Sequence, residues 1–253
     1  MEQQRKARTR RRAVTFVLIV AAFLGVAFLI SVFAGDDEED LATGDSTTTT
    51  STTIEPLLTP VPDGAAITGE TPCPPVDGSA ERTSSFENPP PMCIDTEKTY
   101  TATVTTTKGE FTIELLDDKA PKTVNNFVVL SRYKFYEGVP FHRIDTGFVV
   151  QGGDPTTQGD GDAGYEFEDE LPEAGEYEIG SVAMANSGPD TNGSQFFIVS
   201  GDRGVQLPPN YSLFGKVTEE TMDVVMAIDA VGTANAGTPT EEVKIESIEI
   251  AES

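Results

Sequence analysis

The chain contains no tryptophan, a single histidine and only two cysteines among its 253 residues. A structural zinc site needs four Cys or His ligands, which this chain cannot supply. A Ser-His-Asp triad would have to use His142, and no Gly-x-Ser-x-Gly motif surrounds any serine. The glycines near residue 159 do not follow the spacing of a phosphate-binding loop. These absences argue against zinc, hydrolase and nucleotide chemistry, and we expect no cofactor and no metal.

Positive charge is also scarce. Lys and Arg number 17 against 42 Asp and Glu, which gives a net charge of −25 at pH 7. Many of the basic residues lie within residues 1–12, so the remainder is more acidic still. Such a surface repels nucleic acid and anionic lipid headgroups. We expect no nucleic-acid partner and interpret the acidity as a source of solubility, with attraction of basic partners as the alternative.

The acidic loop between Thr156 and Glu178 has two interpretations. Its carboxylates could ligate calcium, but their spacing does not match the EF-hand loop, so we favour a solvated loop. The carboxylates concerned are Asp160, Asp162, Glu166, Glu168, Asp169 and Glu170.

One long apolar run lies near the N-terminus. Residues 13–34 carry no charge, follow the basic residues 1–12 and precede an acidic cluster at 36–40. At the rise of an α-helix this run spans about 33 Å, which is enough to cross a bilayer. Lys and Arg remain cytoplasmic, so we expect a cell-membrane anchor with the rest of the chain outside the cytoplasm. The alternative is a signal peptide cleaved after Ala34, although signal h-regions are shorter, at about 7–15 residues.

Residues 35–97 are acidic, then rich in Thr, then rich in Pro. Their apolar content is too low to offset the entropy of ordering the chain, so we expect a disordered spacer. Cys73 and Cys93 lie in its later part. Outside the cytoplasm such a pair is most simply a disulfide, which would close a loop of about 20 residues, contribute about 3 kcal/mol and order this part of the spacer.

The pattern changes over residues 98–253, where we expect one domain. Alternating apolar residues over 100–104 and 111–115 flank Lys108-Gly109, which predicts a β-hairpin. Residues 120–130 have a proline at position 121 and a helical apolar face, which predicts a helix, and a second helix is expected over 222–228. Further strands are expected at 141–144, 148–151, 180–184, 196–199, 213–217 and 243–250. Many strands with two isolated helices predict a mainly β fold, an antiparallel barrel or sandwich.

Several motifs of this domain carry a resemblance. They are Phe141-His142-Arg143-Ile144, Gly147-Phe148, Gln151-Gly152-Gly153-Asp154, Met184-Ala185-Asn186, Thr191-Asn192-Gly193-Ser194-Gln195-Phe196-Phe197 and Phe214-Gly215-Lys216-Val217. Together they combine apolar walls with neutral or cationic donors and lack a nucleophile. From about Tyr100 to Ile250 the chain resembles the cyclophilins, which are peptidyl-prolyl cis/trans isomerases.

The resemblance implies a closed eight-stranded antiparallel barrel capped by two helices, acting without a cofactor on proline-containing polypeptides. It implies that Arg143 is the catalytic arginine, assisted by Gln151 and Phe148. It further implies a set of substrate-binding residues, namely His142, Val149, Ala185, Asn186, Gln195, Phe197, Leu207 and Tyr211. We expect a monomer that assists the folding of exported or surface proteins.

The sequence departs from the family at two positions of this set and at Gln206, next to Leu207. Gln206 stands where animal cyclophilins commonly have tryptophan, Tyr211 replaces the second histidine of the groove, and Val149 replaces the usual methionine. These changes argue against tight cyclosporin binding. Tyr211 and the acidic loop between Thr156 and Glu178 motivate the alternative hypothesis, a module that binds proline-containing segments without catalysis. By composition alone, Arg143 would be interpreted as one partner of a surface salt bridge.

Overall fold

The computed structural model describes residues 57–235 and 237–253. The predicted basic tail, membrane anchor and first part of the spacer lie outside this range. Within the described part of the chain, no helix combines the length and the apolar character needed to cross a bilayer.

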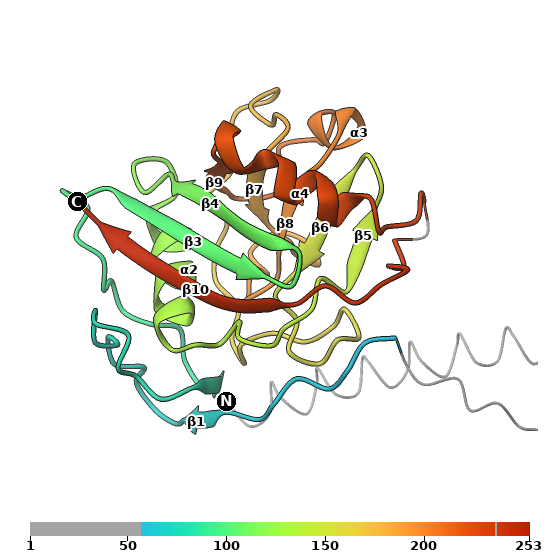
Figure 1. Ribbon diagram of the computed structural model, residues 1–253. Coiled ribbons are helices and arrows are strands. Elements are labelled where there is room, and N and C mark those ends of the chain that lie inside the picture. Colours follow the sequence, from blue (N-terminus) through green and yellow to red (C-terminus); the bar gives the residue numbers. More distant parts are fainter. Residues whose placement is uncertain (1–56, 236) are drawn as a thin grey trace, which may run out of the picture. The chain divides into compact units, whose positions relative to one another are not determined.

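An eight-stranded antiparallel sheet forms the body of the domain (Figure 1). Its strands lie in the order β10-β3-β4-β9-β7-β8-β6-β5. The strands are β3 (Tyr100–Thr106), β4 (Gly109–Leu115), β5 (Arg143–Asp145), β6 (Val149–Gly152), β7 (Ser181–Met184), β8 (Phe196–Val199), β9 (Leu213–Val217) and β10 (Ile245–Glu252). The predicted mainly β architecture and the predicted hairpin, now β3 and β4, are confirmed.

The prediction of a closed barrel is wrong, because the sheet curls but stays open between β10 and β5. Backbone hydrogen bonds from Gly138 N–H to Ile245 O, Ile245 N–H to Val139 O and Phe141 N–H to Val243 O join the segment before β5 to the start of β10. They form an isolated bridge at Pro140 and Lys244 and not a ladder between the two edge strands. Beyond this bridge the register of β10 against β3 shifts between Ile245 and Ser247, and β5 and β10 do not pair.

Two helices cover the curled sheet, as predicted. α2 (Pro121–Arg132) begins with its proline in the first turn and contacts β9 and β10, whereas α4 (Met222–Asp229) lies against β4, β5 and β6. Two shorter helical segments were not predicted, α3 (Asp202–Val205) and the 3₁₀ segment η1 (Glu219–Thr221). α3 matters for function because it follows β8 directly and carries Arg203 to the site described below.

Aromatic rings fill the centre of the domain. The ring of Phe127 on α2 lies 5.4 Å from Tyr136, 5.6 Å from Phe196 and 5.2 Å from Phe214, centroid to centroid. All four side chains are buried. Edge-to-face and tilted contacts of this kind add to the stabilisation by burial alone. They fix α2 against β8 and β9, and thereby the strands that carry the candidate site.

Residues 57–97, which we call the strap, pack on the domain. Order was expected in the part that the Cys73–Cys93 disulfide closes, whereas the described residues before Cys73 were predicted to be disordered. The strap contains a two-stranded parallel sheet of β1 (Ala65–Ile67) and β2 (Thr83–Phe86). Phe86 is 1% exposed, with its ring 5.4 Å from Tyr133 and 6.3 Å from Tyr165. The backbone N–H of Phe86 donates to Ala163 O at 2.8 Å. A few large side chains therefore secure a segment of low overall hydrophobicity.

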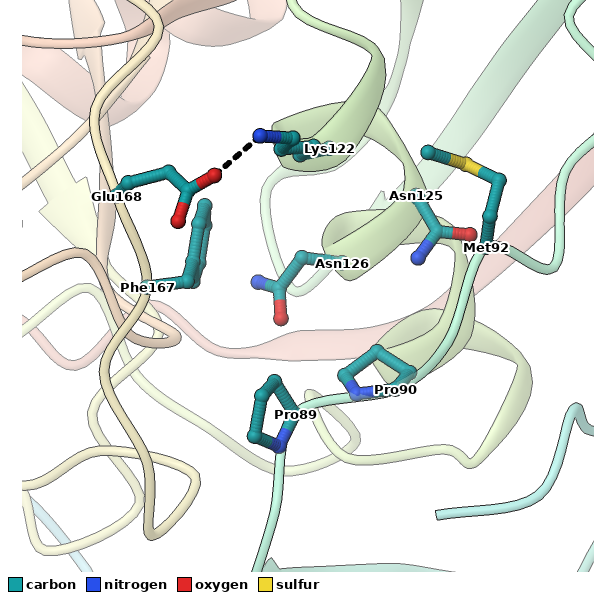
Figure 2. Close-up of a pocket in the computed structure, with 8 residues that line it drawn as sticks. All are labelled: Pro89, Pro90, Met92, Lys122, Asn125, Asn126, Phe167 and Glu168. Atoms are coloured by element: carbon teal, nitrogen blue, oxygen red, sulfur yellow. Dashed lines mark hydrogen bonds and ion pairs between the residues drawn. The ribbon is translucent and has the colours of Figure 1, made fainter. Parts of the chain in front are cut away.

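The predicted disulfide between Cys73 and Cys93 is confirmed, and it lies beside α2. Asn125 on α2 accepts hydrogen bonds from the backbone N–H groups of Cys93 (2.6 Å) and Ile94 (3.2 Å) through Oδ1. Its Nδ2 donates to Pro91 O at 2.9 Å. Figure 2 shows this junction, where Pro89, Pro90 and Met92 of the strap face α2 across a cavity of about 290 Å³. One amide side chain thus satisfies three backbone groups of the strap.

We expect replacement of both cysteines by alanine to destabilise the docked strap by about 3 kcal/mol, because the closed loop no longer restricts the unfolded chain. Native-state hydrogen exchange measures this directly. The amides of Thr83 and Phe86, which donate to Tyr133 O and Ala163 O, should exchange faster, while those of β3 and β4 keep their protection. Unchanged exchange in β2 would contradict a stabilising role for the disulfide.

Candidate active site

The predicted site residues gather where β5, β6, β8 and β7 pair side by side. Arg143 on β5 lies directly opposite Gln151 on β6, and Gln151 lies opposite Phe197 on β8. Phe197 in turn faces Ala183 on β7. Directly opposed residues of an antiparallel pair project from the same face of the sheet. The register alone therefore places the arginine, the glutamine and the phenylalanine in one row.

A chain of hydrogen bonds orients the polar members of this row. Arg143 Nη1 donates to Gln151 Oε1 at 3.2 Å, and Gln151 Nε2 donates to Gln195 Oε1 at 3.0 Å. Gln195 Nε2 then donates to the carbonyl oxygens of Gly159 (3.1 Å) and Gly161 (2.9 Å) in the acidic loop. Each amide orientation is set by the next partner, so the loop backbone fixes which atom Gln151 presents to the guanidinium.

Beside this row lies a second apolar cluster, separate from the main core. Its buried members include Val149, Phe197 and Leu213, and several half-buried side chains pack against them. The half-buried members are Leu116, Phe148, Ala185, Val205, Leu207 and Tyr211. The Tyr211 ring meets Phe197 edge to face at 5.3 Å. All of the predicted apolar site residues, together with Tyr211, thus belong to one partly exposed cluster.

A tight turn between β5 and β6 presents Phe148 to this cluster. Gly147 occupies the left-handed region, with φ +71°, which glycine adopts without steric cost. Its N–H donates to the carboxylate of Asp229 at 3.0 Å, and Ser200 Oγ donates to the same carboxylate at 2.7 Å. The end of α4 therefore anchors the turn that holds Phe148.

Two residues of the site were missed by the sequence analysis, Asp145 and Arg203. The carboxylate of Asp145 lies 2.6 Å from Arg203 Nη2 and 3.5 Å from Arg143 Nη2, so it bridges two guanidinium groups. Both guanidinium carbons also lie over the Phe148 ring, at 5.5 Å for Arg143 and 5.3 Å for Arg203. Attraction between a cation and an aromatic face adds to the ion pairs. Arg143 is thus held from two sides, by Gln151 and by Asp145.

The charge state of Asp145 follows from these contacts. Burial by itself raises the pKa of a carboxyl group, but the hydrogen bond from Arg203, the Asn235 N–H and the charges of both arginines outweigh it. The pKa of Asp145 is consequently lowered below its ordinary value of 3.8. The carboxylate stays ionised at neutral pH and balances one of the two positive charges.

His142 lies next to Arg143 but serves a different purpose. Burial lowers its pKa below the ordinary 6.5, with Arg143 adding to the effect and Asp154 opposing it. Its buried Nδ1 has no hydrogen-bond partner among the described residues. The ring packs beneath Gly159 of the acidic loop, where an added Cβ would lie 3.7 Å from Cδ2. A neutral, half-buried ring of this kind supports the loop rather than transferring protons.

Asn186 is the one predicted residue whose side-chain bonds lie apart from the Arg143 row. Its Nδ2 donates to Asn210 O at 2.8 Å, and its Oδ1 accepts from the Gly188 N–H at 3.3 Å. Tyr211 is fixed nearby, because its backbone N–H donates to Tyr177 Oη at 3.1 Å and its carbonyl accepts from the same hydroxyl at 2.7 Å. These bonds shape the loop that carries Tyr211 to the apolar cluster.

Comparison with known proteins identifies this arrangement. The family model described as cyclophilin type peptidyl-prolyl cis-trans isomerase/CLD matches residues 101–250. The chain belongs to the cyclophilin family. Peptidyl-prolyl cis-trans isomerase A of Mycobacterium tuberculosis is 44% identical over 170 residues, covering 60% of this chain and 93% of that protein. Peptidyl-prolyl cis-trans isomerase B of Streptomyces anulatus is 42% identical and is covered to 94%. The protein is a cyclophilin-type isomerase of X-Pro peptide bonds.

Solved structures agree with this assignment. A cyclophilin of Cryptosporidium parvum shares 33% identity with a TM-score of 0.56, covering 61% of this chain and 99% of that one. The same protein was also solved in the presence of the dipeptide Ala-Pro. The family match begins at residue 101, so the strap precedes the cyclophilin domain and is an addition to it.

We expect Asp145→Asn to lower kcat/KM for a proline peptide by about tenfold, because Arg143 and Arg203 lose the carboxylate that they share and small displacements at a reacting centre are costly. Asp202→Asn on α3 is the matched control, since it removes the same charge from an exposed side chain. Equal activity of the two variants would show that the carboxylate at 145 does not position the site.

Stability should also depend on pH through His142. The pKa of His142 is lower in the folded state than its ordinary value of 6.5. As the pH falls below about 6.5, the unfolded state therefore binds the proton before the folded state does, and the folded state loses stability. The lowered pKa of Asp145 acts in a separate window below 3.8. Urea unfolding of the wild type and His142→Gln at pH 7.5, 6.5 and 5.5 measures the contribution. If the free energy of unfolding depends on pH in the same way in both proteins, His142 is not the source of the pH dependence.

Proposed function

We propose that Arg143 catalyses the rotation of X-Pro bonds in exported or surface polypeptides by stabilising the twisted amide. Rotation breaks amide resonance and has a barrier of about 18–20 kcal/mol. In the twisted state the prolyl nitrogen regains a lone pair, which can accept a hydrogen bond that the planar amide cannot. A donor aimed at that nitrogen therefore binds the transition state more strongly than the ground state.

The contacts that hold the Arg143 guanidinium in place are the observation that best supports this role. Gln151 Oε1 and the Asp145 carboxylate contact different nitrogens of the guanidinium, and the Phe148 ring lies beneath it. Its side chain is still 40% exposed, so donors remain free for a substrate. Guanidinium stays charged at all physiological pH values and presents its donors in a rigid plane, which suits this task better than a lysine.

The apolar cluster beside Arg143 supports a role in holding the proline ring. Phe148, Phe197 and Leu207 offer apolar surface, and Tyr211 closes the cluster where other cyclophilins commonly have histidine. A ring held there stays fixed while the carbonyl group before it swings. The predicted Gln195 and Asn186 would bind the substrate backbone next to it.

We further propose that the domain works outside the cytoplasm, tethered by residues 13–34. The basic residues before this run and the acidic ones after it support the orientation. The disulfide in the strap supports an oxidising compartment, because structural disulfides persist mainly outside the cytoplasm. Polypeptides that fold just beyond the membrane are then the substrates.

We expect Arg143→Ala to lower kcat/KM by about 10²–10³-fold, the usual loss when one transition-state donor is removed. The measurement is acceleration of cis/trans isomerisation in a short proline peptide by the full-length protein. Arg143→Lys is the matched variant, which keeps the charge but loses the planar donor set and should recover only a small part of the activity.

A titration with the same peptide separates catalysis from mere binding. We expect Arg143→Ala to bind the peptide with nearly unchanged affinity but no longer to accelerate its cis/trans isomerisation. Equal acceleration by wild type and Arg143→Ala would overturn the assigned mechanism. Binding by the wild type without any acceleration would support the alternative of a non-catalytic proline-binding module.

A further inference from the structure

The strand β10 forms one edge of the open sheet, and its backbone shows which groups are left unpaired. Ser253 and Thr99 exchange both of their backbone hydrogen bonds, at 3.0 Å each. In an antiparallel ladder, hydrogen-bonded pairs alternate with pairs whose N–H and C=O groups point away from the partner strand. The register from Ser247 to Glu252 against β3 is continuous with the Ser253 pair. Ser247, Glu249 and Ala251 therefore bond to β3.

It follows that the N–H and C=O groups of Ile248 and Ile250 point to the open edge. No hydrogen bond within the described part of the chain uses them. Their side chains are half-buried and pack against the main core, while their backbone groups face the open edge. Unpaired backbone groups at a strand edge are a template for another extended chain.

This edge borders a cavity of about 460 Å³. Ser247, Ile248, Glu249 and Ile250 line one side, and Val76, Asp77 and Gly78 of the strap line another. At about 3.3 Å per strand residue, the four β10 residues can align with three or four residues of an added strand. The Val76 side chain is 64% exposed and offers an apolar contact to such a strand. The strap, which precedes the family match, thus supplies part of the wall.

Charge decides which chain suits the cavity. Asp77, Glu137 and Glu249 line it, with Lys134 and Arg132 as the lining cations. Arg132 is already paired with Glu252 at 2.9 Å. The remaining balance is negative and favours a basic occupant. A second copy of β10 would bring its own Glu246, Glu249 and Glu252 to the edge, and like charges across a strand pair are destabilising.

We propose that the edge of β10 and the strap form a second polypeptide-binding site, which takes an extended segment with basic and branched apolar residues by strand addition. The segment lies antiparallel or parallel to β10, bonds to the backbone of Ile248 and Ile250, and contacts Val76. The site requires no proline and does not depend on the proposed mechanism at Arg143. A polypeptide bound here is retained while its prolines visit the catalytic site, which raises their effective concentration there.

Amide hydrogen exchange of the full-length protein tests the site residue by residue. In the free protein the amides of Ile248 and Ile250 should exchange rapidly, while those of Glu249 and Ala251 are protected by β3. A proline-free decapeptide of alternating lysine and valine should slow exchange at Ile248 and Ile250 by about tenfold or more, and a glutamate–valine peptide should not. Protection of both amides without peptide, or no added protection with it, would overturn the proposal.

Ile250→Pro removes one outward N–H without removing a bond to β3, and Ile250→Val is its matched control. We expect the proline variant to lose peptide binding while both variants keep full activity on a short proline peptide. Should Ile250→Pro fold poorly, the double variant Asp77→Lys/Glu249→Lys serves instead. It should lower the affinity for the lysine–valine peptide by about tenfold, or 1.4 kcal/mol. Displacement of the bound peptide by Ala-Pro would assign it to the catalytic site and overturn the proposal.

Discussion

The pairing of β6 between β5 and β8 is the constraint on which the candidate site depends. This register brings Arg143, Gln151 and Phe197 into one row, although they lie up to 54 residues apart in the chain. A shift by one residue would turn Gln151 to the other face and leave the guanidinium without its partner. The aromatic contacts of Phe127 and the carboxylate of Asp229 act on the same strands and on the turn between them. Much of the domain therefore serves to keep three short strands in register.

Electrostatics around Arg143 follow from this geometry. The chain is strongly acidic, yet two guanidinium groups lie within 5.5 Å of one phenylalanine ring. Their mutual repulsion is tolerated because the buried Asp145 carboxylate lies between them and stays ionised. An arginine that is already paired on one side, as Arg143 is, loses little conformational freedom when it binds a ligand, which suits the role proposed for it. The remaining donors are the ones that the substrate can use.

Local patterns in the sequence predicted most strands, both main helices and the disulfide. Alternation over 100–115 indicates the hairpin, because the period of a strand is visible within a few residues. Single residues decided what the sequence did not reveal. Phe86 secures the strap, and Arg203 reaches Asp145 from α3, which follows β8 directly. Contacts between distant segments of this kind leave no periodic signal in the sequence. The low apolar content of the strap favoured a disordered segment, although a few large side chains hold it on the domain. The roles assigned to individual site residues rest on geometry and on family resemblance.

The docking of the strap has a consequence for the order of events during biosynthesis. Phe86 packs against Tyr133 and Tyr165, and Asn125 receives Cys93, so every surface that holds the strap is made of later residues. The strap leaves the ribosome first but has nothing to bind until α2 and the chain as far as Tyr165 have been synthesised and folded. Vectorial folding, in which N-terminal parts settle first, is therefore reversed here. Docking of the strap therefore depends on the folded domain, whereas the disulfide between Cys73 and Cys93, only 20 residues apart, can close before or after it.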